Sequence, residues 1–217
     1  MSKSKKEKQM QGDFILIDRS GSMSSMWAEA LSSVNSYAKK LGEDKVDTYI
    51  TVATFDANGG KPTFDVIRDR MEPKEWKPIT DSDASPRGMT PLNDAIGKIV
   101  TLARKGHNGK DYDKAAVIIM TDGMENASTE YSHTAAKALL DDCRSKGWQV
   151  IFLGANFDNM AQATSYGNAV GATVAAAAGT MRATTTLMAD KRASYGVSGQ
   201  SMSFSAAEKA ELLKKKK

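Results

Sequence analysis

Phe14-Ile-Leu-Ile-Asp-Arg-Ser-Gly-Ser22 is the stretch that decides the fold. Its first four residues are a continuous apolar run, and its last five are a polar loop that contains a glycine. Two later stretches have the same form, because Ala116-Val-Ile-Ile-Met120 ends at Thr121-Asp122 and Val150-Ile-Phe-Leu153 ends at Gly154. Continuous apolar runs of this length are typical of central parallel strands that are covered on both faces.

An edge hairpin is predicted between the first two of these strands. Asp47-Thr-Tyr-Ile-Thr-Val-Ala-Thr-Phe55 is rich in β-branched and aromatic residues, which favour a strand. Thr63-Phe-Asp-Val-Ile67 follows it, and Asn58-Gly-Gly60 between the two is a turn signal. We therefore expect residues 63–67 to pair with residues 47–55 as an antiparallel edge strand.

Helices are predicted between the strands, because apolar residues recur there at steps of three and four. The four segments are 23–41 before Gly42, 92–103 before Gly106, 132–146 with Ser132 as its cap, and a shorter one that Asp158 caps before Gly167. Strands that alternate with helices form parallel βαβ units. The predicted fold class is therefore α/β, with a doubly wound, Rossmann-like sheet that is mostly parallel, has one antiparallel edge strand and carries helices on both faces.

The chain divides into three parts by composition and charge. Residues 1–11 form a basic tail, residues 12–175 form the predicted domain, and residues 176–217 form an arm rich in Ala, Thr and Ser with a basic end. The whole chain carries a net charge of +4, most of its basic excess lies at the two ends, and the part between them is mildly acidic. Because the arm shows little periodicity, we expect an extended or disordered segment with a short amphipathic helix at 206–213.

Features that would mark export or a membrane are missing from the sequence. The N-terminus lacks the apolar stretch of a secretory leader, and no apolar run approaches the ~20 residues that a membrane span needs. Cys143 is the only cysteine, and we expect a buried thiol. We therefore expect a cytoplasmic protein, or one associated with a virion if a phage encodes it. The lysine-rich ends lack aromatic residues that stack on bases, so no nucleic-acid partner is expected beyond weak contacts of these ends.

Polar side chains follow the predicted strands where a doubly wound sheet binds ligands, at the carboxyl ends. Ser20, Ser22 and Thr90 offer hydroxyl oxygens, and Asp18 and Asp122 offer carboxylates. This set of hard oxygen donors without His or Cys suits Mg²⁺ or Mn²⁺ and disfavours Zn²⁺ or Cu²⁺. If the neutral hydroxyls contact the ion directly and the carboxylates act through water, the ion stays short of negative charge. It would then attract a carboxylate from outside.

These segments resemble the metal ion-dependent adhesion site of the von Willebrand factor A family. The resemblance rests on Asp18-x-Ser20-x-Ser22, on Thr90 in a Gly-x-Thr-Pro-Leu context and on Thr121-Asp122-Gly123, and it covers residues 12–174. Gly154-Ala-Asn156 after a strand is similar to bacterial and phage members of that family. The resemblance implies that the five oxygen donors named above hold the ion, and that an acidic residue of a partner protein completes its ligands.

The predicted function is a Mg²⁺-dependent protein-binding module, an adaptor or assembly factor that engages an Asp or Glu of its partner through the metal. Arg19, Glu125 and Asn126 lie close to the donors in sequence, and we expect them at the rim that meets the partner. An alternative is a structural subunit of a phage virion or bacterial multimer. In that alternative the fold is a scaffold for a homo-oligomer, and the arm after residue 175 wraps a neighbouring subunit.

An enzyme is the function that the residues support least. Metal-dependent phosphatases with an aspartyl nucleophile after the first strand commonly place a second Asp two residues later, where this chain has Ser20. The sequence also lacks the glycine-rich phosphate loop, the dinucleotide-binding glycine motif and the nucleophile elbow of hydrolases. We therefore expect no catalytic residue.

Overall fold

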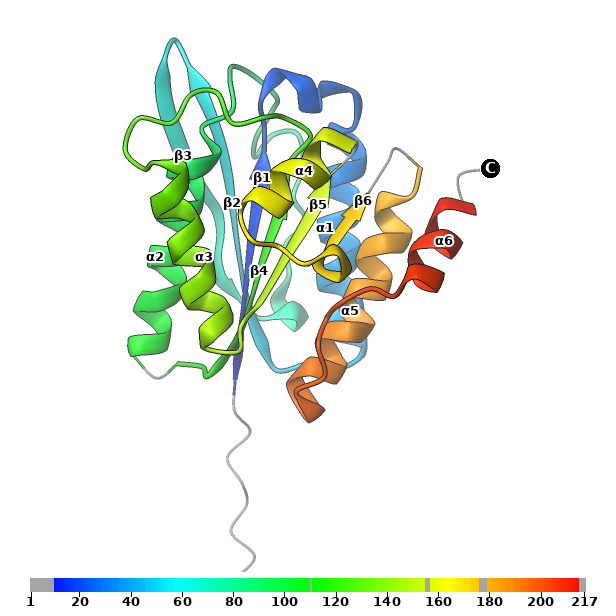
Figure 1. The fold of residues 1–217 in the computed structure, drawn as a ribbon. Coiled ribbons are helices and arrows are strands. Elements are labelled where there is room, and N and C mark those ends of the chain that lie inside the picture. The colour runs from blue at the N-terminus through cyan, green and yellow to red at the C-terminus, as the bar shows by residue number, and fades with distance from the viewer. Residues whose placement is uncertain (1–9, 110, 155–156, 176–178, 215–217) are drawn as a thin grey trace, which may run out of the picture.

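The sheet has six strands in the order β3-β2-β1-β4-β5-β6, as the computed structural model shows (Figure 1). The structure describes residues 10–109, 111–154, 157–175 and 179–214. Neighbouring strands pair in parallel except β2 and β3, which form the antiparallel hairpin at one edge. The fold class predicted from the sequence is therefore confirmed. The strands are β1 (Gln11–Asp18), β2 (Thr48–Asn58), β3 (Lys61–Met71), β4 (Lys114–Met120), β5 (Gln149–Gly154) and β6 (Thr173–Ala175).

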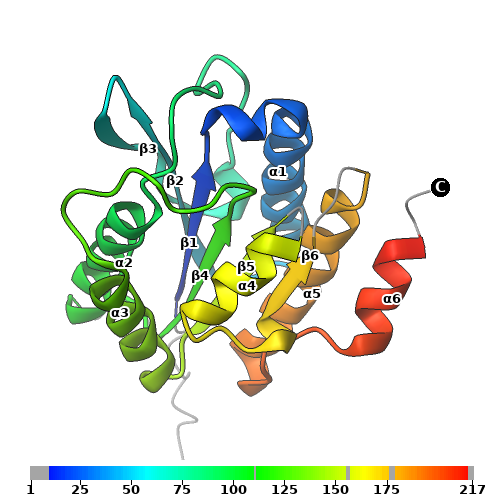
Figure 2. The ribbon, with the colours of Figure 1, turned by 45° about the horizontal axis from the view of Figure 1, so that its top comes forward.

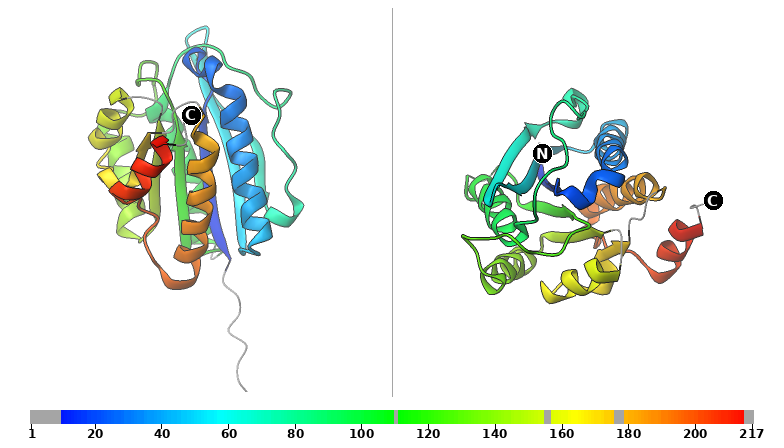
Figure 3. Two further views of the ribbon diagram at one scale, coloured as in Figure 1. Left: turned by 90° about the vertical axis from the view of Figure 1, so that its right-hand side faces the viewer. Right: turned by 90° about the horizontal axis from the view of Figure 1, so that it is seen from above.

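Helices cover both faces of the sheet (Figure 3). One face carries α1 (Trp27–Glu43) and α5 (Met181–Ser198), and the other carries α2 (Leu92–Asn108), α3 (His133–Ser145) and α4 (Phe157–Ser165). Helix α6 (Ala206–Lys214) lies outside α5 (Figure 1). No helix of the described residues is both long and apolar enough to cross a membrane. Three short 3₁₀ segments complete the structure, namely η1 (Gly21–Ser25), η2 (Pro73–Glu75) and η3 (Val170–Ala172).

The side chains of β1 explain the two layers, because alternate residues of a strand point to opposite faces of its sheet. Ile15 and Ile17 pack in the apolar cluster beneath α1 and α5. Phe14 and Leu16 pack in the cluster beneath α2 and α3. All four side chains are buried and β1 has two strands on one side and three on the other, so it is one of the central strands that the apolar runs predicted.

The expectation of an extended or disordered arm after residue 175 is wrong for most of that segment. Helix α5 packs along α1 on the face of the same domain. Its buried face combines Met181 and Met188 with the polar residues Thr184, Thr185 and Arg192. Because these polar residues interrupt the apolar period, the helix could not be recognised from its pattern of apolar residues. Residues 1–9 and 215–217, which include most of the basic ends, lie outside the described residues.

Helix boundaries agree with the capping signals in one case and differ in three, the first of which is α1, which ends at Glu43 and therefore contains Gly42. Ser132 caps α3 as expected, since its hydroxyl accepts a hydrogen bond from the Ala135 amide at 3.2 Å. Helix α2 continues past Gly106, where a β-carbon would lie 2.8 Å from the Tyr112 ring, so this glycine serves close packing rather than termination. Helix α4 begins at Phe157 and therefore contains Asp158 instead of being capped by it.

Candidate metal centre

Three loops meet beyond the carboxyl ends of β1 and β4, which Figure 2 shows from the side of these ends. The loop after β1 contacts the loop before α2, because the Gly21 amide donates to the Gly88 carbonyl at 3.1 Å. The loop after β4 contacts the same segment, because the Asn126 amide donates to the Thr90 carbonyl at 3.0 Å. Gly88 has a positive φ of 69° and lies against the Ala57 backbone, where no side chain would fit. The topology therefore brings the three predicted segments together.

Hydrogen bonds connect four of the five predicted donors. Asp18 accepts from the Ser20 amide at 2.7 Å and from the Thr121 hydroxyl at 2.6 Å. The hydroxyl oxygens of Ser20 and Ser22 lie 3.0 Å apart, and the Ser22 hydroxyl donates to the Asp122 carboxylate at 2.7 Å. Thr121 is a member of this network that the sequence did not single out, although it stands directly before Asp122. The network fixes both carboxylates against the serine loop.

Gly123 shows that the fifth donor, Thr90, lies in the same place. A β-carbon on this glycine would be 2.6 Å from Thr90 Oγ1, 3.3 Å from Asp18 Oδ2 and 3.4 Å from Ser22 Oγ. The backbone of Thr90 is held by Asn126, whose side-chain oxygen accepts from the Thr90 amide at 2.8 Å. Among the described residues, none makes a hydrogen bond with the Thr90 hydroxyl.

The two carboxylates of this cluster lack a basic partner among the described residues. Burial raises the pKa of Asp18 to about 6, and repulsion from Asp122 adds to this, although hydrogen bonds from Thr121 and Ser20 oppose the shift. Burial also raises the pKa of Asp122, against the hydrogen bond from Ser22. Asp18 is fully buried. A buried carboxylate that faces a second carboxylate is costly unless a cation balances it.

Two other buried carboxylates of the sheet, one on β1 and one on β2, are balanced by arginines. Asp13 pairs with the fully buried Arg192. Asp56 pairs with Arg19 at 2.8 Å and with Arg87 at 2.8 Å, and its pKa is lowered although burial opposes this. The candidate centre differs from these two sites, because the negative charge of its two carboxylates is not compensated by an arginine or lysine of the described residues. Its two carboxylates and three hydroxyls are a donor set that fits a hard divalent cation such as Mg²⁺ or Mn²⁺.

The expectation that Arg19 lies at the rim is wrong. The residue is buried, with only 5% of its surface exposed. Its guanidinium donates to Asp56 at 2.8 Å, to Asp65 at 2.5 Å and to the Thr63 hydroxyl at 3.1 Å. Arg19 therefore clamps the β2–β3 hairpin to the end of β1. Sequence reasoning missed this role because the three partners are 37 to 46 residues away.

Glu125 is also a structural residue rather than a rim residue. Its carboxylate accepts from the backbone amides of Asn93, Ala127 and Ser128 at 2.7–2.9 Å, which shapes the loop after β4. Asn126, by contrast, is exposed beside Thr90, and its place at a partner-binding rim stays a prediction. Gln162 of α4 was not predicted, and its amide donates to the Gly123 carbonyl at 3.0 Å. No local pattern marks Gln162, because its partner is distant in sequence.

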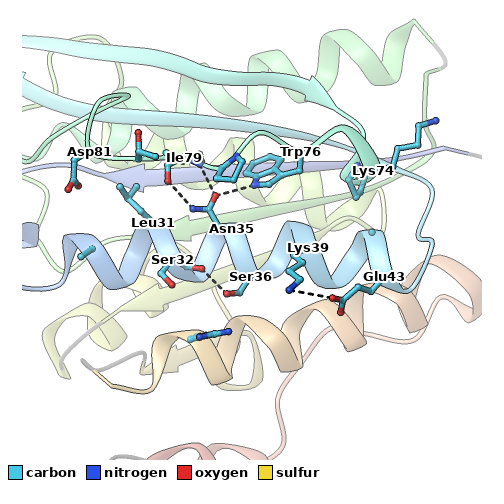
Figure 4. Close-up of a pocket in the computed structure, with 16 residues that line it drawn as sticks. Leu31, Ser32, Asn35, Ser36, Lys39, Glu43, Lys74, Trp76, Ile79 and Asp81 are labelled. Carbon is cyan, nitrogen blue, oxygen red and sulfur yellow. Dashed lines mark hydrogen bonds and ion pairs between the residues drawn. The ribbon is translucent and has the colours of Figure 1, made fainter.

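A concave surface lies away from these loops. It is a groove of about 820 Å³ between α1, the segment 73–81 and Arg182 of α5 (Figure 4). Asn35 shapes it, since its side chain donates to the Ile79 carbonyl at 2.8 Å and accepts from the Trp76 indole at 3.1 Å. None of the five predicted donors lines this groove. The groove and the candidate metal centre are therefore separate features.

Comparison with solved structures shows the same fold in proteins of distant sequence. Manganese-loaded TRAP protein of Plasmodium vivax aligns with a TM-score of 0.59 and 14% identity, over 81% of this chain and 72% of that chain. The SpRpn10 VWA domain aligns with a TM-score of 0.52 and 13% identity, over 75% and 85%. The pilus adhesin SpaC of Lactobacillus rhamnosus GG, in an open conformation, aligns with a TM-score of 0.63 and 11% identity, over 90% and 31%. At these identities the likeness concerns the fold alone.

The comparison with curated proteins found no match. The comparison with family models, in contrast, identifies a family. The model described as von Willebrand factor type A domain matches residues 14–188. This range contains all three loops of the candidate centre and the first part of α5. The chain therefore belongs to the von Willebrand factor type A domain family.

Proposed function

We propose that this domain binds Mg²⁺ or Mn²⁺ at the five oxygen donors and, through the ion, holds an acidic residue of a partner protein. The observation that carries the proposal is the pair of carboxylates, Asp18 and Asp122, which share a hydroxyl-rich cradle without a basic partner among the described residues. A divalent cation supplies the missing positive charge and an electrophilic site for a carboxylate. Ser20, Ser22 and Thr90 would hold the ion without adding charge.

The charges of the three loops make the binding of a partner depend on the metal. The loops contain two arginines, Arg19 and Arg87, and both are paired with Asp56. An approaching carboxylate would otherwise meet Asp18 and Asp122, which repel it. Like charges at this range cost free energy in a poorly solvated site. We therefore expect removal of the metal to abolish binding of an acidic partner rather than to weaken it slightly.

The first experiment measures the metal itself. Calorimetric titration of the wild-type protein with Mn²⁺ is expected to show one site, and Thr90→Val is expected to lose it, because valine keeps the shape and removes the hydroxyl. Thr54→Val is the matched control, since the Thr54 hydroxyl is buried without a hydrogen-bond partner. Equal affinity in wild type and Thr90→Val contradicts the proposed ligand set.

The second experiment identifies the partner. Tagged protein is incubated with lysate of the source organism in Mg²⁺ and again in EDTA, and the retained proteins are identified by mass spectrometry. The expected partner is retained in Mg²⁺ and lost both in EDTA and with Thr90→Val. A partner that is held equally in EDTA contradicts the metal bridge.

We propose that the site does not catalyse a reaction. Its titratable groups among the described residues are the two carboxylates, and the position of a second phosphatase aspartate is Ser20, whose hydroxyl is bound to Ser22. The two histidines have other partners, because His107 bonds to the Tyr112 carbonyl and His133 to the Ser165 hydroxyl. Phosphatase turnover in Mg²⁺ that disappears in Asp18→Asn would overturn this proposal.

The alternative of a structural subunit loses its main argument. That argument was an arm after residue 175 that wraps a neighbouring subunit, but α5 packs on α1 of the same chain. Glu29 of α1 accepts hydrogen bonds from the Gly179 and Met181 amides at 2.7 and 2.9 Å, which fixes the start of α5. The segment therefore completes its own domain, and a binding module is the function that we favour.

A further inference from the structure

Two exposed methionines belong to the loops of the candidate metal centre. Met89 is 48% exposed and directly precedes Thr90, and Met124 is 52% exposed and lies two residues after Asp122. Six large apolar side chains are exposed in the described part of the chain, and these two belong to the loops of the centre. Scattered exposed apolar residues are ordinary on a protein surface. Exposed apolar side chains beside a ligand site, in contrast, indicate a surface that binds a partner.

The backbone fixes where the two methionines stand. The amide and carbonyl of Met89 exchange hydrogen bonds of 2.9 Å with Ala57 at the end of β2. Gly123, the neighbour of Met124, lies in contact range of Thr90, the neighbour of Met89. The two methionines therefore belong to adjoining loops that meet at the cradle. The Met89 backbone is held at its amide and its carbonyl, and the residues on either side of Met124, Gly123 and Glu125, are held by the side chain of Gln162. The unbranched side chains keep the rotational freedom that lets methionine fit varied apolar surfaces.

We propose that Met89 and Met124 form an apolar rim that selects the partner. The rim fits a peptide segment in which the Asp or Glu that reaches the metal has aliphatic or aromatic neighbours. This inference rests on the proposed function of the centre. Arg19 and Arg87, the two arginines of these loops, are paired with Asp56, so neither is a free partner for a further acidic residue of the peptide. Apolar neighbours, in contrast, bury the apolar surface of the two methionine side chains, and this burial contributes binding free energy.

The test uses the full chain with Mg²⁺ and a bead-displayed heptapeptide library that has a fixed central Glu and random neighbours. We expect retained peptides to be enriched in Leu, Ile, Met and Phe beside the Glu. The affinity of a selected peptide is expected to fall about tenfold in the Met89→Gln/Met124→Gln double variant, because apolar burial is lost. Mn²⁺ affinity should stay unchanged in this variant. Val197→Gln, at a residue 90% exposed near the end of α5, is the matched control and should bind the peptide as wild type does.

The outcomes separate the inference from the proposed function. Mg²⁺-dependent capture without a preference for apolar neighbours overturns the methionine rim and leaves the metal bridge standing. Equal peptide affinity in wild type and the double variant also overturns the rim. Failure of Mg²⁺-dependent capture by a protein that binds Mn²⁺ overturns the inferred peptide partner. Failure of wild-type protein to bind Mn²⁺ overturns the proposed function itself.

Discussion

Thr90 Oγ1 lies 2.6 Å from the position that a β-carbon on Gly123 would occupy. The same β-carbon would lie 3.3 Å from a carboxylate oxygen of Asp18 and 3.4 Å from the hydroxyl of Ser22. The missing side chain at position 123 therefore keeps open the space in which donors of different loops face one another. Glycine is required at position 123 because the Thr90 hydroxyl approaches its backbone closely, and not because of its backbone angles.

Gly123→Ala is therefore expected to weaken Mn²⁺ binding by about tenfold or more while the domain stays folded. The added methyl group forces the Thr90 hydroxyl away from the cradle, and rotation of one side chain costs on the order of 1 kcal/mol or less in stability. Calorimetric titration measures the metal affinity, and circular dichroism confirms the fold.

Gly21→Ala is the matched control in the neighbouring loop. A β-carbon at this glycine would have its nearest neighbour at 3.6 Å, the Gly88 carbonyl oxygen, which is an ordinary contact. This variant should bind Mn²⁺ as wild type does. Unchanged affinity in Gly123→Ala as well would show that the ion does not bind in this cradle.

Asp18→Asn is expected to stabilise the metal-free domain at neutral pH and to abolish stabilisation by metal. Burial raises the pKa of Asp18 to about 6, so the metal-free fold favours the protonated form. Wild type therefore loses up to about 3 kcal/mol of stability as the pH rises from about 4 to about 7. The asparagine variant lacks this loss, and its amide still accepts a hydrogen bond at the same place.

Urea unfolding in EDTA at pH 4.5 and pH 7.5 measures this effect. The stability gap between Asp18→Asn and wild type should be larger at pH 7.5. Addition of Mg²⁺ at pH 7.5 should stabilise wild type and leave the variant unchanged. A variant that is less stable than wild type in EDTA at pH 7.5 would show that Asp18 is balanced by another group.

The central strands, and the loops in which the five proposed donors lie, could be predicted because their signals are local. The apolar run before Asp18 and the polar loop after it are consecutive in sequence, and parallel strands place such loops at one edge of the sheet. The spacing of Ser20 and Ser22 from Asp18 belongs to the same loop. Local signals of this kind can be recognised in a single sequence.

Roles that depend on distant partners could not be predicted. Arg19 looks like an exposed basic residue until the β2–β3 hairpin brings Asp65 beside it. Helix α5 lacks an apolar stripe because Arg192, on its buried face, meets Asp13 at the start of β1. In both cases an ion pair allows a charged side chain to be buried, whereas the residue type alone predicts an exposed position.

Arg192→Met is expected to destabilise the domain by about 3–5 kcal/mol, because it leaves the Asp13 carboxylate buried without its cation. Asp13→Asn should restore part of this loss in the Arg192→Met background, although it is destabilising in wild type. Urea unfolding of the four proteins measures the coupling. Additive losses would show that the pair does not act as a unit.

The fold should require α5, so a chain that ends at residue 175 should not unfold cooperatively. That chain leaves uncovered the side of α1 on which α5 packs and removes the cation of Asp13. A chain that ends at Ser205 keeps α5 together with the buried Met202 and Phe204, and it loses only α6 and the residues after it. Thermal unfolding followed by circular dichroism should therefore show a sharp transition for residues 1–205 and none for residues 1–175. If the shorter chain melts as sharply as the longer one, the domain ends before α5 and the helix is a dispensable cover on α1.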